Sequence, residues 1–120
     1  MKAYTDIEQS KKLAEFLPIE SADMAYWKKS YLPNDYAIMA RHTKELQEGF
    51  EAKGMEYIPC WSLAALLDII PYPTLSKHAD ETWSCASWME KIKPYFVEGC
   101  DSPINACYEM IIKLKERDLI

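Results

Sequence analysis

The side chains best suited to covalent chemistry are four cysteines and two histidines: Cys60, Cys85, Cys100, Cys107, His42 and His78. Cys60 stands at the front of the apolar segment PCWSLAALLDIIPYP, residues 59–73. If this segment is a helix, its N-terminal dipole favours a thiolate, and His42 or His78 can supply the base of a thiol-dependent enzyme. No nucleophile elbow or oxyanion motif surrounds Cys60, so this enzyme is kept as the alternative function and no residue is assigned a catalytic role.

The same side chains have the wrong spacing for a metal site. No C-x-x-C or H-x-x-x-H pair is present to place two ligands on one turn. Phosphate-cradling loops are excluded too, because Gly49, Gly54 and Gly99 form no cluster. We therefore expect free thiols that pack as small apolar side chains, with no metal and no cofactor.

Aromatic residues are the more unusual feature, since the chain has four tryptophans and eight tyrosines. Exposed aromatic side chains beside lysines are typical anchors for a protein partner. Alternation along a strand puts Trp83 and Trp88 on opposite faces, so one of them is exposed unless helices cover both faces of the sheet. The candidate binding residues are Trp27, Tyr31, Tyr36, Trp83 and Trp88.

Three helices that must position these residues are indicated by their caps. Thr5 and Glu8 fit a capping box that begins a helix. Thr43 can cap a second helix that ends near Gly54. Ser102, followed by a proline, begins a last helix whose apolar stripe is expected to pack on a sheet.

The remaining elements follow from hydrophobic runs and prolines. The segment between Pro59 and Pro71 is apolar around nearly the whole helical circumference, which predicts a helix, capped by Cys60 or Ser62, that is buried on most sides. Two strands or extended segments are expected around the turn at 33–35, and TWSCASWM with IKPYFVEGC predicts a hairpin. The fold class is α+β: a single compact domain, 1–120, with a small antiparallel sheet, including a hairpin near 82–98, packed with about four helices.

Length and charge restrict the class of partner. The 120 residues carry a formal net charge of −5, which disfavours a nucleic-acid partner because phosphate is repelled at long range. No apolar run is long enough to span a membrane and the first residues lack a signal-peptide core, so a cytoplasmic location is expected. The partner expected is another protein, or a second copy in a homodimer, since an edge strand and exposed aromatics favour self-association.

Three segments carry a resemblance: TDIEQSKKLAEFLPIESADM, IPCWSLAALLDIIPYP and SPINACYEMIIKLKERDLI. Together they resemble a group of small uncharacterised proteins of gut bacteria, many encoded in prophages or other mobile elements. The order strand, strand, terminal helix is also similar to phage proteins described as ABA sandwich domains. The resemblance implies an accessory role in a mobile element and carries over no functional residue. With the aromatic residues, it indicates a non-catalytic module that acts through protein–protein contacts.

Overall fold

The computed structural model describes residues 2–29, 31, 33, 35–90 and 92–120. Within these residues the chain forms four α-helices and two antiparallel three-stranded sheets, which confirms the α+β class. The chain divides into two compact units: the N-terminal unit, Thr5–Ser62, and the C-terminal unit, Leu63–Ile120 together with Met1–Tyr4. The expectation of one domain over 1–120 stays a prediction.

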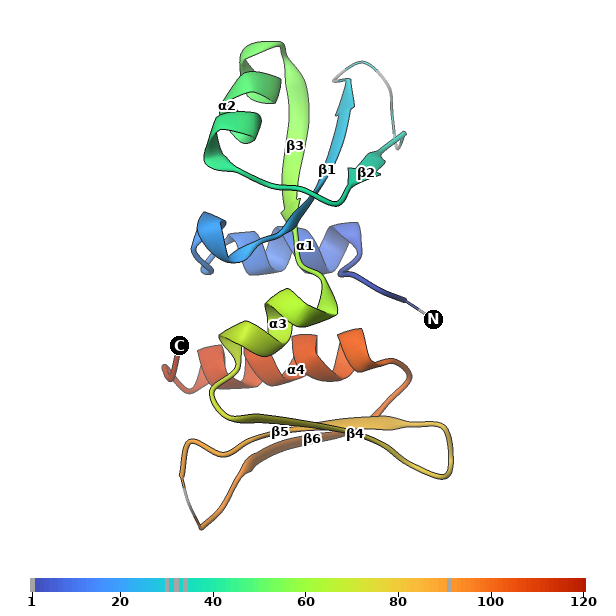
Figure 1. Cartoon of the computed structure of the whole chain (residues 1–120), viewed down its shortest axis with the longest axis vertical. Coiled ribbons are helices and arrows are strands. Elements are labelled where there is room, and N and C mark those ends of the chain that lie inside the picture. The colour runs from blue at the N-terminus through green and yellow to red at the C-terminus, as the bar shows by residue number, and fades with distance from the viewer. Residues whose placement is uncertain (1, 30, 32, 34, 91) are drawn as a thin grey trace. The chain divides into compact units, whose positions relative to one another are not determined.

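The N-terminal unit contains α1 (Ile7–Ala14), a 3-10 turn η1 (Ile19–Ser21), β1 (Met24–Lys29), β2 (Ala37–Met39), α2 (Lys44–Ala52) and β3 (Met55–Cys60). Its sheet has the order β2-β1-β3, with Tyr26 opposite Ile38 on one side and Ile58 on the other. Helices α1 and α2 both pack against β3 (Figure 1). The two strands expected around the turn at 33–35 are confirmed as β1 and β2, although Asn34 of that turn lies outside the described residues.

Of the first two helices, α2 begins at the predicted cap and α1 does not. Thr43 accepts a hydrogen bond from the Leu46 amide and caps α2, and Gly54 follows the helix at φ +75°, a conformation that favours glycine. The cap of α1 is Asp6, whose carboxylate accepts from the Gln9 amide, so the prediction that Thr5 is the cap is wrong. The side chain of Thr5 is fully buried and bonds elsewhere.

The C-terminal unit contains α3 (Leu63–Ile69), β4 (Pro73–Lys77), β5 (Trp83–Ser87), β6 (Tyr95–Cys100) and α4 (Pro103–Glu116). Its sheet has the order β4-β5-β6, which confirms the hairpin near 82–98 and places β6 at an edge, directly after Pro94. Ser102 caps α4 by accepting from the Asn105 amide. Helix α4 lies along one face of this sheet (Figure 1) and buries Ile104, Cys107, Ile111 and Leu114.

The apolar segment at 59–73 differs from its prediction. Pro59 and Cys60 end β3, where Pro59 lies opposite Ala25, so the segment is partly strand. Helix α3 starts only at Leu63, and Leu66 is its one buried residue, while Ala64 is exposed. Burial on most sides is therefore wrong for this helix, because the apolar run is divided between two elements.

Candidate interaction surface

Two of the five predicted binding residues are held inside the N-terminal unit. The Trp27 ring lies 5.2 Å from the Phe50 ring of α2, centroid to centroid, and is partly buried. The Tyr36 hydroxyl donates to Glu56 Oε1 at 2.8 Å, and Lys28 Nζ lies 3.1 Å from the other oxygen of Glu56. Burial and the Glu56 hydrogen bond raise the pKa of Tyr36 to about 12, while the Tyr36 hydroxyl lowers the pKa of Glu56. Trp27 and Tyr36 thus both form contacts within their own unit that contribute to its packing.

Tyr31 differs from them because it is 74% exposed in the connection between β1 and β2. The Lys29 ammonium lies 6.0 Å from its ring centroid. A cation at this distance from an exposed ring contributes about 0.5–1 kcal/mol. Tyr31 is therefore accessible to solvent, and it is an exposed aromatic of the N-terminal unit.

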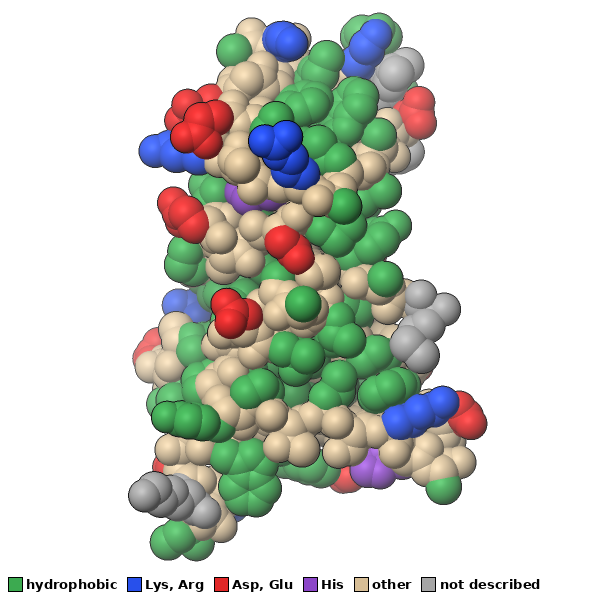
Figure 2. Space-filling view, viewed as in Figure 1, with side chains coloured by type: hydrophobic (Ala, Val, Ile, Leu, Met, Phe, Trp, Pro, Cys, Tyr) green, Lys and Arg blue, Asp and Glu red, His purple; other side chains and the backbone are tan. Residues whose placement is uncertain are grey.

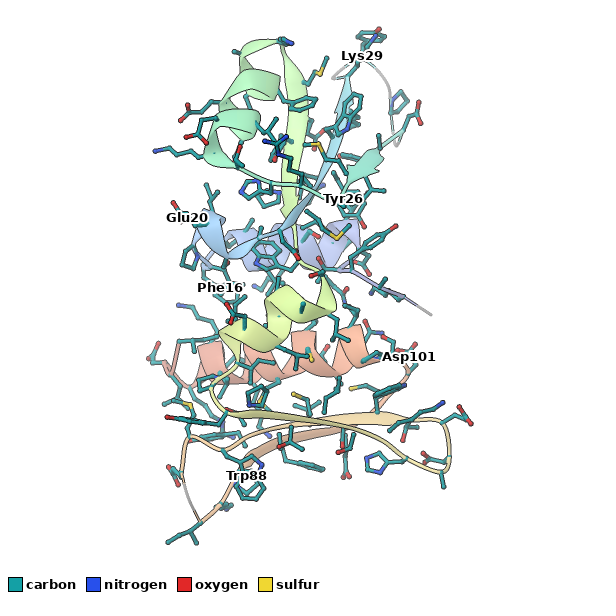
Figure 3. The ribbon with its side chains drawn as sticks, viewed as in Figure 1. Phe16, Glu20, Tyr26, Lys29, Trp88 and Asp101 are labelled. Carbon is teal, nitrogen blue, oxygen red and sulfur yellow. The ribbon has the colours of Figure 1, made fainter. Side chains whose placement is uncertain are left out.

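The two tryptophans of the C-terminal unit lie on opposite faces, as alternation predicts. Trp83 is partly buried, with Lys77 Nζ 6.0 Å from its ring centroid. Trp88 directly follows β5, is 43% exposed, and lies on the side of the sheet away from α4 (Figure 3). Of the two, Trp88 is the one available to a partner.

The β5–β6 hairpin exposes further apolar side chains, and we call the four together the hairpin surface: Trp88, Met89, Ile92 and Phe96. Ile92 is 96% exposed and Phe96 is 43% exposed. Phe96 lies opposite Ala86 in the sheet, and the small alanine leaves its ring uncovered. Hydrophobic side chains are visible at this end of the sheet in Figure 2. Sequence reasoning missed Phe96, because its exposure depends on its register against Ala86.

A groove of about 460 Å³ adjoins the hairpin surface between β6 and the last turns of α4. Lys113 Nζ donates to the Phe96 carbonyl at 2.7 Å, and the Arg117 guanidinium lies 5.6 Å from the centroid of the Tyr95 ring. Lys93 lines the same groove, and among the lining residues that the structure describes Glu90 alone is acidic. Among the described residues, none of the three cations forms a salt bridge. The groove is therefore locally cationic in a chain of net negative charge.

The environment of Cys60 does not favour a nucleophile. Its side chain is 0% exposed, its thiol donates to the Thr5 carbonyl at 3.4 Å, and it lies 3.5 Å from the Thr5 hydroxyl. Burial raises the pKa of the Cys60 thiol. A protonated, enclosed thiol is a poor nucleophile, since the thiolate is the reactive form.

The two histidines form hydrogen bonds within their own units. His42 Nδ1 lies 2.7 Å from the Tyr57 hydroxyl, and burial lowers the His42 pKa and raises that of Tyr57 to about 12. His78 Nε2 lies 2.8 Å from the Ser84 hydroxyl. All four cysteines are free thiols, as expected. In the part of the chain that the structure describes, no three His, Cys, Asp or Glu side chains gather to hold a metal ion.

Comparison of the chain with family models, curated proteins and solved structures found no match. Among the described residues, no helix has the length and apolar character needed to cross a bilayer. The interaction surface is therefore assigned from its own geometry and charge.

Proposed function

We propose that this protein is a non-catalytic binding module that contacts another protein through the hairpin surface, with Trp88 as the central anchor. The observation that carries the proposal is the pair Trp88 and Phe96, both 43% exposed at the hairpin end of the β4-β5-β6 sheet. An accessory role in a mobile element, implied by the sequence resemblance, belongs to the same proposal.

Free energy supports this assignment of the surface. Apolar area removed from water stabilises a complex by roughly 25 cal/mol per Å². A large aromatic side chain has on the order of 150–250 Å² to bury, and the exposed 43% of Trp88 and of Phe96 is what remains for a partner to cover. Tryptophan is also enriched among the few residues that dominate protein interfaces. Trp88 and its neighbours therefore provide a driving force for association that Trp27 and Tyr36, already in contact with their own unit, do not.

The experiment is a binding measurement with a matched pair of variants. A protein captured by the wild-type chain from a lysate of the encoding organism is purified, and its affinity is measured by titration calorimetry. We expect the double variant Trp88→Ala, Phe96→Ala to bind at least about 30-fold more weakly, as for an interface anchor worth about 2 kcal/mol. Tyr31→Ala, which removes a more exposed ring from the N-terminal unit, is expected to bind as the wild type does.

Two results would count against the proposal. Equal affinity of the double variant and the wild type, with circular dichroism spectra unchanged, would remove the hairpin surface from the interface. Light scattering that shows a homodimer dissociated by the same substitutions would assign this surface to a second copy instead of another protein.

A further inference from the structure

We infer that the outer edge of β6 and the cationic groove beside it bind an extended segment of the partner in which acidic and apolar residues alternate. This inference rests on the proposed function, because it identifies the partner chemistry at the same surface. The segment would add a strand to the β4-β5-β6 sheet, a mode of peptide recognition in which main-chain hydrogen bonds supply affinity and side-chain pockets supply specificity.

The edge of β6 is open for such a strand. In the order β4-β5-β6, β6 pairs with β5 alone. Alternate residues of an edge strand direct their N–H and C=O groups away from the neighbouring strand. The Phe96 carbonyl accepts a hydrogen bond from the Lys113 side chain, so a donor outside the sheet can reach this main-chain group. Main-chain groups on this edge are thus accessible to a second chain.

The charge of the groove selects an acidic occupant. Of the described residues that line this groove, Lys93, Lys113 and Arg117 are cationic and Glu90 alone is acidic, and no salt bridge within the described residues neutralises the three cations. A carboxylate brought between these cations forms charge-assisted hydrogen bonds, which are stronger than neutral ones. The formal charge of the whole chain is −5, so the cationic groove is a local feature and not a consequence of composition.

The two faces of the sheet differ in chemistry, so successive side chains of the bound segment must alternate in type. Side chains of an added strand point in turn to the α4 side and to the open side. On the α4 side they meet Lys113 and Arg117, and on the open side they lie beside Phe96 and Trp88. Acidic residues therefore fit one face and apolar residues fit the other.

The acidic part of the occupant is confined to the start of β6. Beyond Val97, the groove between β6 and α4 is lined by Glu98, Glu109 and Glu116 as well as by Lys113 and Arg117. A carboxylate placed there meets three like charges, whereas one placed over Tyr95 and Phe96 meets the three cations and only Glu90 among the described lining residues. A short acidic segment fits the site better than a long one.

Lys113 has a specific part in this mechanism. In the free protein the Lys113 ammonium, which comes from α4, donates to the Phe96 carbonyl, and covering a sheet edge in this way limits indiscriminate strand pairing. A carboxylate of the partner would draw Lys113 away, and a main-chain N–H of the partner would replace it on the carbonyl. A neutral strand offers no such exchange. A lipid surface is disfavoured because a lipid headgroup has no row of main-chain N–H and C=O groups to pair with a strand edge.

The test uses the full chain, labelled with ¹⁵N, and the synthetic peptide acetyl-Val-Glu-Val-Glu-Val-Glu-amide. We expect amide shifts along β6 and the end of α4, and affinity that falls as NaCl is raised from about 0.1 to about 1 M, where the Debye length shortens from about 10 to about 3 Å. The peptide with Gln in place of Glu is expected to bind at least tenfold more weakly. Lys113→Gln and Arg117→Gln are each expected to weaken the Glu peptide roughly two- to fivefold, whereas Lys44→Gln, which removes one charge from the N-terminal unit, is expected to have no effect.

Several results would overturn the inference. Equal binding of the Glu and Gln peptides would refute the charge selection, and shifts confined to other elements would refute the site. Binding of vesicles containing phosphatidylserine that Lys113→Gln weakens, without peptide shifts, would assign the surface to a membrane. If no peptide binds while the purified partner still depends on Trp88, the proposed function stands and the acidic-strand inference alone fails.

Discussion

Replacing Thr5 by valine tests the polar cluster that encloses Cys60. The Thr5 hydroxyl accepts from the Trp61 amide at 3.2 Å and lies 2.8 Å from the Ser10 hydroxyl, and both Thr5 and Ser10 are fully buried. Valine has nearly the same shape but no hydroxyl, so it leaves these groups without that partner. The change isolates the hydrogen bonds from the packing.

The expected cost can be worked out from these contacts. A buried donor left unsatisfied costs roughly 1–3 kcal/mol, and the loss of an ordinary hydrogen bond by Ser10 costs roughly 0.5–1.5 kcal/mol. The methyl group that replaces the Thr5 hydroxyl returns about 0.8 kcal/mol. We therefore expect Thr5→Val to lower the free energy of unfolding by about 2 kcal/mol. Thr5→Ser keeps the hydroxyl and loses only a methyl group, so it should cost about 1 kcal/mol.

The assay is urea denaturation followed by far-ultraviolet circular dichroism, with hydrogen exchange of the Trp61 amide as a local probe. In Thr5→Val this amide should exchange faster than in Thr5→Ser, because it has lost its acceptor. A Thr5→Val protein as stable as Thr5→Ser, with the same exchange at Trp61, would refute the reasoning. The thiol of Cys60 would then lie in a cluster held by packing alone.

Three further predictions concern other parts of the structure. Burial lowers the His42 pKa below the ordinary 6.5, so below pH 6.5 the unfolded chain binds more protons than the folded one and the free energy of unfolding should fall as the pH drops. Urea denaturation should give a lower free energy of unfolding at pH 5.5 than at pH 7.5. His42→Gln should make the difference between the two pH values smaller. In the folded protein, iodoacetamide should modify Cys60 at least about tenfold more slowly than Cys100 by peptide mapping, and faster modification of Cys60 would restore the enzyme hypothesis. Gly49→Ala, within α2 and with no atom near the added carbon, should stabilise the helix by about 0.5–1 kcal/mol and so raise the thermal midpoint. Gly54→Ala, at φ +75°, should lower the free energy of unfolding by about 1 kcal/mol and so lower the thermal midpoint. Shifts of the same sign in the two variants would contradict the assigned backbone.

Helix caps could be predicted from sequence where the capping chemistry is local. Thr43 and Ser102 each bond an amide three residues later, so neighbouring residues determine the result. The choice between Thr5 and Asp6 was different, because both residues can cap. Thr5 bonds to Ser10, Cys60 and Trp61, and the partners at 60 and 61 are brought near only by the fold.

The interaction surface could be predicted only in part for the same reason. Alternation along the sequence predicts that one of Trp83 and Trp88 is exposed, and the structure identifies it as Trp88. Phe96 requires its register opposite Ala86, and the groove requires α4 to lie beside β6 so that Lys113 reaches the Phe96 carbonyl. Pairings between distant segments leave no periodic signal in the sequence, and the apolar run at 59–73 gave no sign that it is divided between a strand and a helix.

The placement of the four tryptophans gives each unit its own optical reporter. Trp61 is completely enclosed and its indole N–H donates to the Ser21 hydroxyl at 3.0 Å, so its emission should be blue-shifted and insensitive to iodide or acrylamide. Trp88 is exposed to solvent, so its emission should be red-shifted and readily quenched. In a variant with Trp27→Phe and Trp83→Phe, which removes the partly buried tryptophan of each unit, selective quenching separates the emission of Thr5–Ser62 from that of Leu63–Ile120. Thermal unfolding followed in each emission would then reveal whether the two halves of the chain melt together.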